Sequence, residues 1–286
     1  MKRGIHEKEL LMLLTFACVA CLSAVLLTSC SSSNEEAESS EDTSADISTL
    51  IVGFDNSYPP YGFMDENNEP TGFDLDLAAE VANRNGWELQ LEAIDWDAKD
   101  ALLNQDSINC IWNGFTMEGR EDDYTFSEPY MLNEQVIVVK SDSGITDFAG
   151  LADKTVVTQV DSAALDVLEG DQAELAGTFA ELQTLSDYNN AFMQLESGMV
   201  DAVACDLSIA QYQMSANEGT YTMLEEPLSS EHYAVGFKKG NEALAQQVTD
   251  TLKEMYEDGT VEELINKYAD YGMNIEILGV EVRQIE

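Results

Sequence analysis

One arginine, Arg120, follows a short loop that contains Gly114, in a chain where cations are scarce. The 286 residues include 13 lysines and arginines against 55 aspartates and glutamates. A guanidinium is planar, stays charged at any physiological pH and can donate two parallel hydrogen bonds to a carboxylate. We therefore interpret Arg120 as a candidate anchor for a small anionic group. The alternative is a surface ion pair with Glu118, Glu121 or Asp122, since such pairs are common and weak.

Two further segments offer groups of the kind that bind charged ligands. Ser162 and Ala163 lie at a predicted strand-to-helix junction, where free N–H groups and the helix dipole favour a carboxylate. The alternative there is ordinary N-capping by Asp161 or Ser162. Asp206 follows the predicted strand Val200–Cys205, and it is either the cap of the next helix or a counter-ion for an ammonium group.

Aromatic side chains near these groups could form the walls of a small pocket. The loop Asp55–Phe63 carries three aromatic rings, Tyr58 among them, and two prolines that stiffen it, while Trp96 ends the second predicted strand. The alternative for each ring is a place in the packed interior. A guanidinium for a carboxylate, Asp206 for an ammonium group and the open carbonyl of Gly114 together complement a zwitterion. This set of residues therefore predicts an α-amino acid as the ligand.

Short β-branched runs alternate with helical patterns from Thr49 onward, which predicts α/β architecture with largely parallel sheets. Asp74 is a predicted helix N-cap, and Gly86 is a predicted helix stop. The predicted strands are Leu50–Phe54, Glu88–Glu92, Ile108–Trp112, Gln135–Val139, Thr155–Thr158, Thr178–Leu182 and Val200–Cys205. The predicted helices are Asp74–Asn85, Asp97–Leu103, Ser162–Glu169, Tyr188–Glu196, Leu207–Met214, Glu242–Glu257 and Val261–Tyr268.

The first residues have the pattern of a secretory signal: a basic start, the apolar run Leu10–Leu27 and small residues before a cysteine. The ending Leu27–Cys30 resembles the bacterial lipoprotein signal, in which Cys30 is lipidated and becomes the new N-terminus. Cys21 offers a second, weaker cleavage point. The alternative is an uncleaved membrane anchor, because a run of this length is near the minimum that spans a bilayer. The segment Ser31–Ser48, rich in Ser, Glu and Asp, is expected to be a flexible tether.

Charge and cysteine content limit the choice of partners. The formal net charge is −42 at pH 7, which argues against nucleic acid or anionic lipid as a partner. Cys110 and Cys205 could pair in an oxidising compartment. Each falls in or at the end of a predicted buried strand, so we expect two free, packed thiols. No metal-spaced cluster or phosphate-binding loop is found in the sequence, and no cofactor is expected.

The order of these segments resembles the family-3 extracellular solute-binding proteins of bacterial ABC transporters, the polar amino-acid receptors. The resemblance covers about Leu50 to Tyr268. Its markers are Val52–Asp55 with Tyr58–Tyr61, Gly72–Leu77, Gly114–Thr116 with Arg120, Phe126–Tyr130, Gly198–Ala202 and Asp258–Thr260.

The resemblance implies a role for each candidate residue. Arg120 would clamp the ligand carboxylate, helped by the N–H of Thr116 and by the corner at Ser162 and Ala163. Asp206, the Gly114 carbonyl and the Thr116 hydroxyl would hold the α-ammonium group. The ligand side chain would be contacted by Asp55, Tyr58, Trp96 and Gln159.

The resemblance also implies a type II periplasmic-binding-protein-like fold, in which two α/β lobes close on the ligand about a hinge. The chain would cross between the lobes near Met131–Gln135 and Ser230–Ala234. The predicted limits are 1–29 for the lipoprotein signal peptide, 30–48 for the lipidated cysteine and the tether, 49–132 and 234–286 for lobe 1, and 133–233 for lobe 2.

Three features depart from the family pattern. The spacing from Thr116 to Arg120 is one residue shorter than usual, so the approach of Arg120 is expected to differ. Asp161 stands where a glycine is usual; it can adopt left-handed geometry, but it adds a charge close to the anion site. Asp106 and Asn109 replace the usual Gly and Asp of the turn before the third strand, and Asn109 is expected to be structural.

We therefore expect a lipid-anchored, monomeric receptor on the outer face of the cytoplasmic membrane. It would capture an extracellular L-amino acid and deliver it to ABC permease subunits. Asp55, Tyr58 and Trp96 indicate a polar or cationic side chain, and no catalytic residue is expected. The alternatives are a cell-surface amino-acid sensor and a dehydratase-like enzyme on the same fold, for which Glu118 and Glu134 are the candidate acids.

Overall fold

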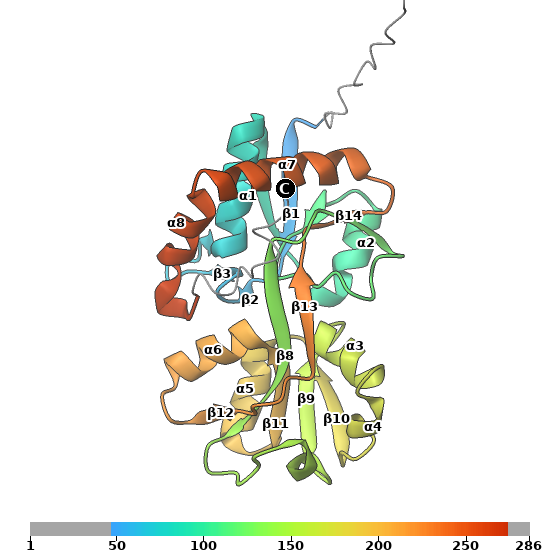
Figure 1. Ribbon diagram of the computed structural model, residues 1–286, viewed down its shortest axis with the longest axis vertical. Helices are drawn as coiled ribbons and strands as arrows, with labels where there is room; N and C mark the ends of the chain where they lie inside the picture. The colour runs from blue at the N-terminus through green and yellow to red at the C-terminus, as the bar shows by residue number, and fades with distance from the viewer. Residues whose placement is uncertain (1–46, 274–286) are drawn as a thin grey trace, which may run out of the picture. The chain divides into compact units, whose positions relative to one another are not determined.

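The computed structural model describes residues 47–273, so the predicted signal peptide, Cys30 and most of the tether lie outside the described residues. The described chain forms two lobes, each built on a β-sheet that helices cover (Figure 1). This arrangement confirms the expected two-lobed α/β fold. None of the helices formed by residues 47–273 combines the length and the apolar character needed to cross a bilayer.

The first lobe has a five-stranded sheet. In sheet order its strands are β5 (Glu88–Ala93), β1 (Thr49–Phe54), β6 (Cys110–Ile111), β14 (Gly236–Lys238) and β7 (Tyr124–Phe126). β1 is parallel to β5 and β6, whereas β14 is antiparallel to β6 and β7. The helical elements of this lobe are α1 (Phe73–Asn85), η1 (Trp96–Ala98), α2 (Lys99–Asn104), α7 (Glu242–Glu257), α8 (Thr260–Lys267) and η3 (Ala269–Tyr271).

The second lobe has a six-stranded sheet. Its strands are β10 (Glu181–Leu185), β9 (Thr155–Gln159), β11 (Ala202–Asp206), β8 (Met131–Lys140) and β12 (Tyr221–Met223) in sheet order, with β13 (Ser229–Tyr233) also paired to β8. β9 is parallel to β10 and β11, and β8 is antiparallel to β11, β12 and β13. The helical elements here are η2 (Phe148–Leu151), α3 (Ala163–Glu169), α4 (Ala173–Ala176), α5 (Tyr188–Ser197) and α6 (Leu207–Ala216).

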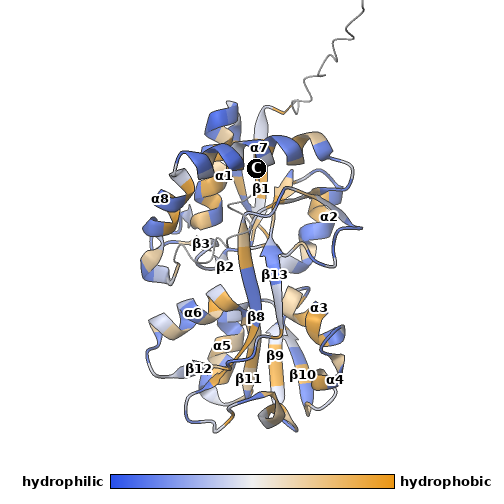
Figure 2. Cartoon of the chain, viewed as in Figure 1, coloured by the Kyte–Doolittle hydropathy of each residue, from blue (hydrophilic) through white to orange (hydrophobic). Residues whose placement is uncertain are grey.

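Two strands connect the lobes as an antiparallel ribbon (Figure 1). Its register runs from Ser229 opposite Gln135 to Tyr233 opposite Met131, and we call these paired segments of β8 and β13 the hinge ribbon. Figure 2 shows that β8 is polar in its middle and apolar on either side. A third, small sheet next to the pocket described below consists of β2 (Ser57–Tyr58), β3 (Gly62–Met64) and β4 (Pro70–Thr71).

Buried aliphatic and aromatic side chains of the strands fill both lobes. Leu50, Val52 and Phe54 of β1 are fully buried, as expected for alternate residues of a strand covered by a helix. Cys110 and Cys205 are buried and free, which confirms the expectation of two packed thiols.

The sheets are mixed, so the expectation of largely parallel sheets is wrong. β8, which enters the second lobe, runs against β11, and β14, which follows the return to the first lobe, runs against β6. The predicted strand Thr178–Leu182 begins only at Glu181, because the Thr178 hydroxyl donates to the Leu175 carbonyl and prolongs the turn after α4. The third strand starts late because the Asn109 side chain, not a strand neighbour, accepts the N–H of Ile51 at 2.7 Å. This contact confirms a structural role for Asn109.

Candidate ligand-binding site

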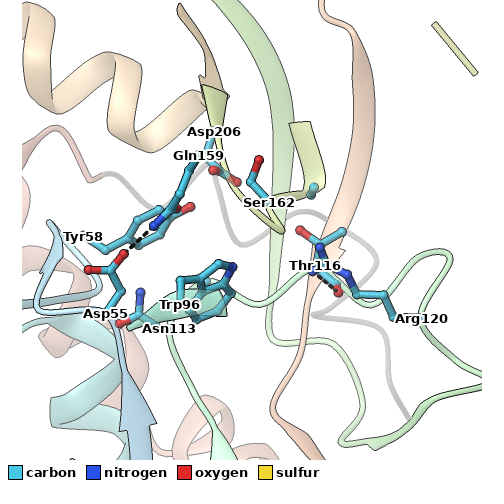
Figure 3. A pocket seen from close by; sticks show the side chains of 11 residues that line it. Asp55, Tyr58, Trp96, Asn113, Thr116, Arg120, Gln159, Ser162 and Asp206 are labelled. Atoms are coloured by element: carbon cyan, nitrogen blue, oxygen red, sulfur yellow. Dashed lines mark hydrogen bonds between the residues drawn. The ribbon is translucent and has the colours of Figure 1, made fainter. Parts of the chain in front are cut away.

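A cavity has a lining drawn from both lobes (Figure 3). All ten of the site residues that the sequence predicted within the described chain line it, and Asn113, which was not predicted, is the eleventh. The lining residues are Asp55, Tyr58, Trp96, Asn113, Gly114, Thr116, Arg120, Gln159, Ser162, Ala163 and Asp206.

The ends of parallel strands bring much of this set together. Asp55 directly follows β1, Gln159 is the last residue of β9, and Asp206 is the last residue of β11. Parallel strands of one sheet end at the same edge, which is where ligands bind in open α/β sheets. The polar residues at these positions are therefore placed by the strands that precede them, and each is almost completely buried.

Asp55 makes a direct contact across the two lobes. Its Oδ2 accepts a 2.7 Å hydrogen bond from Gln159 Nε2, and its Oδ1 accepts one from the N–H of Ser57 at 2.8 Å. Burial raises the pKa of the Asp55 carboxyl, the bonds from Gln159 and Ser57 oppose this effect, and the charges of Asp187 and Asp95 add to it. This part of the pocket is therefore acidic.

Asp161, the residue that replaces a glycine, has a cationic partner that the sequence did not reveal. It adopts the expected left-handed conformation, with φ of 54°. Its carbonyl accepts from Trp96 Nε1 at 3.1 Å, and its Oδ2 lies 3.6 Å from Lys99 Nζ. Lys99 is buried and lies over the Trp96 ring, and this burial lowers the pKa of its ammonium group. The extra charge at Asp161 is therefore opposed by Lys99.

Arg120 has an acidic partner, but not one of those expected. Its Nη2 lies 2.8 Å from Asp166 Oδ2 on α3, in the other lobe. Its Nη1 donates to the Thr116 carbonyl at 3.4 Å, and the guanidinium lies 5.0 Å from the centre of the Phe115 ring. Its side chain is only 12% exposed, so the interpretation as an ordinary surface pair with Glu118, Glu121 or Asp122 is wrong.

The backbone at Gly114 is held by a buried aspartate. Gly114 has φ of 58°, and a Cβ there would lie 3.1 Å from ring atoms of Tyr58, Tyr61 and Tyr233, so only glycine fits. Its N–H donates to Asp74 Oδ2 at 2.6 Å.

Asp74 also accepts from the hydroxyl of Tyr130 at 2.7 Å, and burial raises the pKa of its carboxyl to about 7. The prediction that Asp74 caps helix α1 is wrong. The N-cap position is Gly72, and the Asp74 side chain lies in the interior, where it supports the Gly114 loop.

Ser162 acts as a helix cap at the pocket wall. Its hydroxyl accepts the N–H of Leu165 at 3.2 Å and lies 3.1 Å from the Thr158 hydroxyl. The N-capping alternative is therefore confirmed for Ser162, while Asp161 makes no such bond. Since Ser162 and Ala163 also line the cavity, capping and ligand contact are compatible there.

Asp206 occupies the N-cap position of α6, but its side chain makes no capping bond, so that alternative is wrong. Instead its Oδ1 accepts from Asn133 Nδ2 at 2.9 Å, Gln135 Nε2 at 2.7 Å and the Tyr233 hydroxyl at 2.7 Å. Burial raises the pKa of the Asp206 carboxyl, and these donors oppose the effect. The Asp206 carboxylate therefore lies at the cavity wall, and the groups that donate to it are two neutral amides and a neutral hydroxyl.

The hinge ribbon supplies a second carboxylate that sequence reasoning missed. Glu231 Oε1 accepts from the Thr116 hydroxyl at 2.8 Å, and from Asn133 Nδ2 and Gln135 Nε2 at 2.8 and 2.7 Å. Because the Thr116 hydroxyl gives its hydrogen to Glu231, it can only accept a hydrogen bond from a ligand. The polar run Asn133–Gln135, between apolar residues of the same strand, is the one sequence signal that could have pointed here.

Two observations concern chemistry other than ligand binding. Within residues 47–273 there is no group of three or more His, Cys, Asp and Glu side chains that could hold a metal ion. Glu118, one of the two acids considered for an enzyme, has its Oε1 2.6 Å from His232 Nδ1 at the surface. The pocket is thus built to hold charged groups by hydrogen bonds and ion pairs.

Comparison with known proteins agrees with this geometry. Residues 50–271 match the model of the bacterial extracellular solute-binding proteins, family 3. The chain belongs to this family.

One protein compared by sequence and two solved structures show how similar this family-3 protein is to known binding proteins. The L-cystine-binding protein TcyJ of Escherichia coli is 29% identical over 77% of this chain and 82% of its own. An ABC uptake transporter substrate-binding protein from Streptococcus pneumoniae with bound histidine has a TM-score of 0.75 and 31% identity, over 77% and 92% of the two chains. An ancestral amino-acid-binding protein, a precursor of cyclohexadienyl dehydratase, has a TM-score of 0.71 and 29% identity, over 77% and 95%.

Proposed function

We propose that the chain is the substrate-binding receptor of an amino-acid ABC transporter and captures an extracellular L-amino acid by closure of its lobes. The observation that carries this proposal is the cavity lined by a guanidinium and by a buried carboxylate, Arg120 and Asp206 (Figure 3). A ligand with an anionic and a cationic group can satisfy both. Contacts from both lobes would stabilise the closed form, which requires no bond to be made or broken.

The two charged groups of the ligand have distinct partners in this proposal. The carboxylate binds Arg120, the N–H of Thr116 and the corner at Ser162 and Ala163. Arg120 already pairs with Asp166, but a guanidinium has five N–H donors and can serve two carboxylates. The α-ammonium group binds Asp206, the Gly114 carbonyl and the Thr116 hydroxyl.

The remaining lining residues select the ligand side chain. Asp55, Tyr58, Trp96 and Gln159 provide an acidic group, two rings and an amide, which suits a polar or cationic side chain. Lys99 already opposes Asp161, and Arg120 is assigned to the α-carboxylate of the ligand, so neither is free for an acidic side chain. The named ligands of the relatives, cystine and histidine, are polar but differ in shape, so they support the class and not one member of it.

The proposed location is the outer face of the cytoplasmic membrane, with a lipid anchor at Cys30 and ABC permease subunits as partners. The family is one of extracellular proteins, which agrees with a place outside the cytoplasm. Limits of 1–29 for the signal and 30–48 for the tether are proposed from the sequence pattern. A sensor that binds the same ligand would share this site, and permease and ATPase genes beside the gene for this chain would favour transport.

We propose no enzymatic turnover. The reported relatives are named as binding proteins, although one is a precursor of a dehydratase. Incubation with amino acids and with prephenate-like cyclic acids, followed by chromatography, should return each compound unchanged. A product formed by the wild-type chain would favour the enzyme instead.

A thermal-shift panel of the twenty L-amino acids and their D-forms tests the binding proposal. Polar or cationic L-amino acids should raise the melting temperature by several degrees, since a ligand stabilises the state that it binds. The matching D-forms should have little effect, because a clamp on both charges fixes the direction of the side chain. A shift with acidic amino acids alone would overturn the side-chain assignment, and no shift with any of them would overturn the proposed function.

A further inference from the structure

The hinge ribbon carries a buried carboxyl group, Glu231, that the ligand assignment above does not use. Glu231 is 3% exposed and lies opposite Asn133 in the register of β8 and β13. Asn133 and Gln135 project to the same side of the ribbon as Glu231, because alternate residues of a strand share a face. Glu134, between them, projects to the other side.

Two amide groups join Glu231 to Asp206. The side-chain nitrogen of Asn133 donates to Asp206 Oδ1 at 2.9 Å and to Glu231 Oε1 at 2.8 Å. The nitrogen of Gln135 donates to the same two oxygens, at 2.7 Å each. An amide nitrogen has two hydrogens, so each amide is fully used in bridging the two carboxylates. The two acids therefore share one hydrogen-bonded unit at the wall of the cavity.

This unit has no cation of its own. Among the ion pairs of the described residues, none involves Asp206 or Glu231, and the groups that contact the two acids are neutral amides and hydroxyls. Two buried like charges without a counter-ion are unfavourable, so the unit holds a proton more readily than an exposed acid. The titratable groups that face the unit are Tyr58 from β2, Tyr61 from the following loop, Tyr188 from α5 and Tyr233 from β13. His232 and Glu118 lie on the opposite face of the ribbon.

The titration of Glu231 agrees with this charge argument. Burial raises the pKa of its carboxyl to about 7, the charge of Asp206 adds to the effect, and the three donors oppose it. Without a cation beside it, the unit therefore holds a proton below pH 7 and loses it as the pH rises through about 7.

We propose that Glu231 and Asp206 act as one cation-binding unit, which gives up a proton when the ammonium group of the ligand binds. Before binding, the unit is a carboxylate and a carboxylic acid. On binding, the O–H bond of the acid breaks, the proton passes to the solvent, and the ammonium group lies against Asp206, with the ionised Glu231 joined to Asp206 through the two amides. The inference rests on the proposed function, since it takes the ammonium group of an amino acid as the cation.

Glu231 is a positioning residue in this scheme, because it does not line the cavity. It orients Asp206 through Asn133 and Gln135, and it fixes the hydroxyl of Thr116 as an acceptor. Its position on β13 places this proton exchange on a strand that joins the two lobes.

Calorimetric titration in two buffers of different ionisation enthalpy tests the proposal, because the difference in heat gives the number of protons released. The full folded chain is titrated with L-arginine, L-histidine, L-glutamine and L-cystine between pH 5.5 and 9. The wild type should release about half a proton per bound ligand near pH 7 and almost none near pH 9. Its affinity should rise with pH, by up to about tenfold per unit below pH 7.

Three variants separate this role from general effects on the ribbon. Glu231→Gln keeps the size and an acceptor oxygen, and it should release almost no proton near pH 7 and show an affinity that hardly changes with pH. Glu134→Gln, on the same ribbon but the other face, should behave as the wild type. Glu231→Asp should restore part of the proton release, which a purely structural role would not predict.

The outcomes distinguish the inference from the function on which it rests. Proton release that is equal in the wild type and in Glu231→Gln would overturn the inference and leave amino-acid binding intact. If Glu231→Gln does not fold, measured by circular dichroism, the wild-type pH profile and Glu231→Asp still decide. Binding of none of the four amino acids by the folded wild type would overturn both.

Discussion

Asp74 illustrates how a single polar residue can serve the site without touching it. Its position at the start of a helical pattern made it look like a cap, but the side chain is completely buried and accepts from Gly114 and Tyr130. The Gly114 loop is thereby fixed at the wall of the cavity. Burial disfavours the charged form of this carboxyl group and raises its pKa to about 7.

Replacement of Asp74 by Asn should change how stability depends on pH. A carboxyl whose pKa is raised in the folded state favours folding below its unfolded pKa and loses that contribution as pH rises through about 7. Asn imitates the protonated form at every pH. Between pH 5 and 8 the free energy of unfolding of Asp74→Asn, relative to wild type, should therefore rise by about 1–3 kcal/mol. Urea unfolding at both pH values measures this, with exposed Asp142→Asn as an unaffected control.

Asp161 stands where a glycine is usual, and Lys99 offsets the negative charge that it adds. Asp161 adds a negative charge near the proposed carboxylate site, and Lys99 lies beside it with its side chain 5% exposed. Lys99→Met should weaken amino-acid binding about tenfold, because it removes a contact between the lobes and leaves the charge of Asp161 unopposed. Calorimetry measures the affinity, and Lys253→Met, whose ion pair with Glu128 lies elsewhere, is the matched control. Equal affinity of Lys99→Met and wild type would contradict this account.

Residues at strand ends were predictable because their surroundings are local. Asp55, Gln159 and Asp206 follow recognisable strands, and a strand end at a sheet edge is a common place for a site. Lys99 and Glu231 were not predictable in the same way. Their partners, Asp161 and Thr116, are 62 and 115 residues away in the chain, and only the packing of the lobes brings them together.

Elements with a clear start and end were predicted well, and those shaped by distant contacts were not. Helix α7 spans the predicted Glu242–Glu257. The strand predicted at Thr178 is displaced, because the preceding helical turn continues through a side-chain bond. The hinge ribbon is the element on which the proposed function depends most, since Asn133 of β8 and Tyr233 of β13 hold Asp206 at the cavity wall.

The end of α1 offers a test of element-level stability that is independent of the site. Gly86 has φ of 70°, and a Cβ there would meet nothing within 4 Å. Gly86→Ala should therefore lower the free energy of unfolding by about 1 kcal/mol through backbone strain alone. Gly86→Asn should cost less, because asparagine tolerates left-handed geometry. Denaturant unfolding compares the two, and an alanine variant as stable as wild type would show that the helix ends differently.

At the scale of the whole molecule, the structure is that of a closed pair of lobes. The contacts that join them beside the cavity include hydrogen bonds from Gln159 to Asp55 and from Trp96 to the Asp161 carbonyl, and the ion pair of Arg120 with Asp166. Each of these contacts includes at least one residue that lines the cavity, so closure and ligand capture are coupled. The surplus of acidic residues, 55 against 13 basic ones, argues against nucleic acid as a partner but does not disturb a site with its own cations.

Calorimetric comparison of wild type with Arg120→Ala tests the central claim most directly, with the amino acid that gives the largest thermal shift as ligand. Arg84→Ala is the matched control, because Arg84 pairs with Glu80 and Asp258 on the far side of α1. Loss of a buried charged partner should weaken binding at least about 100-fold in Arg120→Ala, with the fold retained. Arg84→Ala should bind as the wild type does. Unchanged affinity in a folded Arg120→Ala variant would contradict the zwitterion clamp.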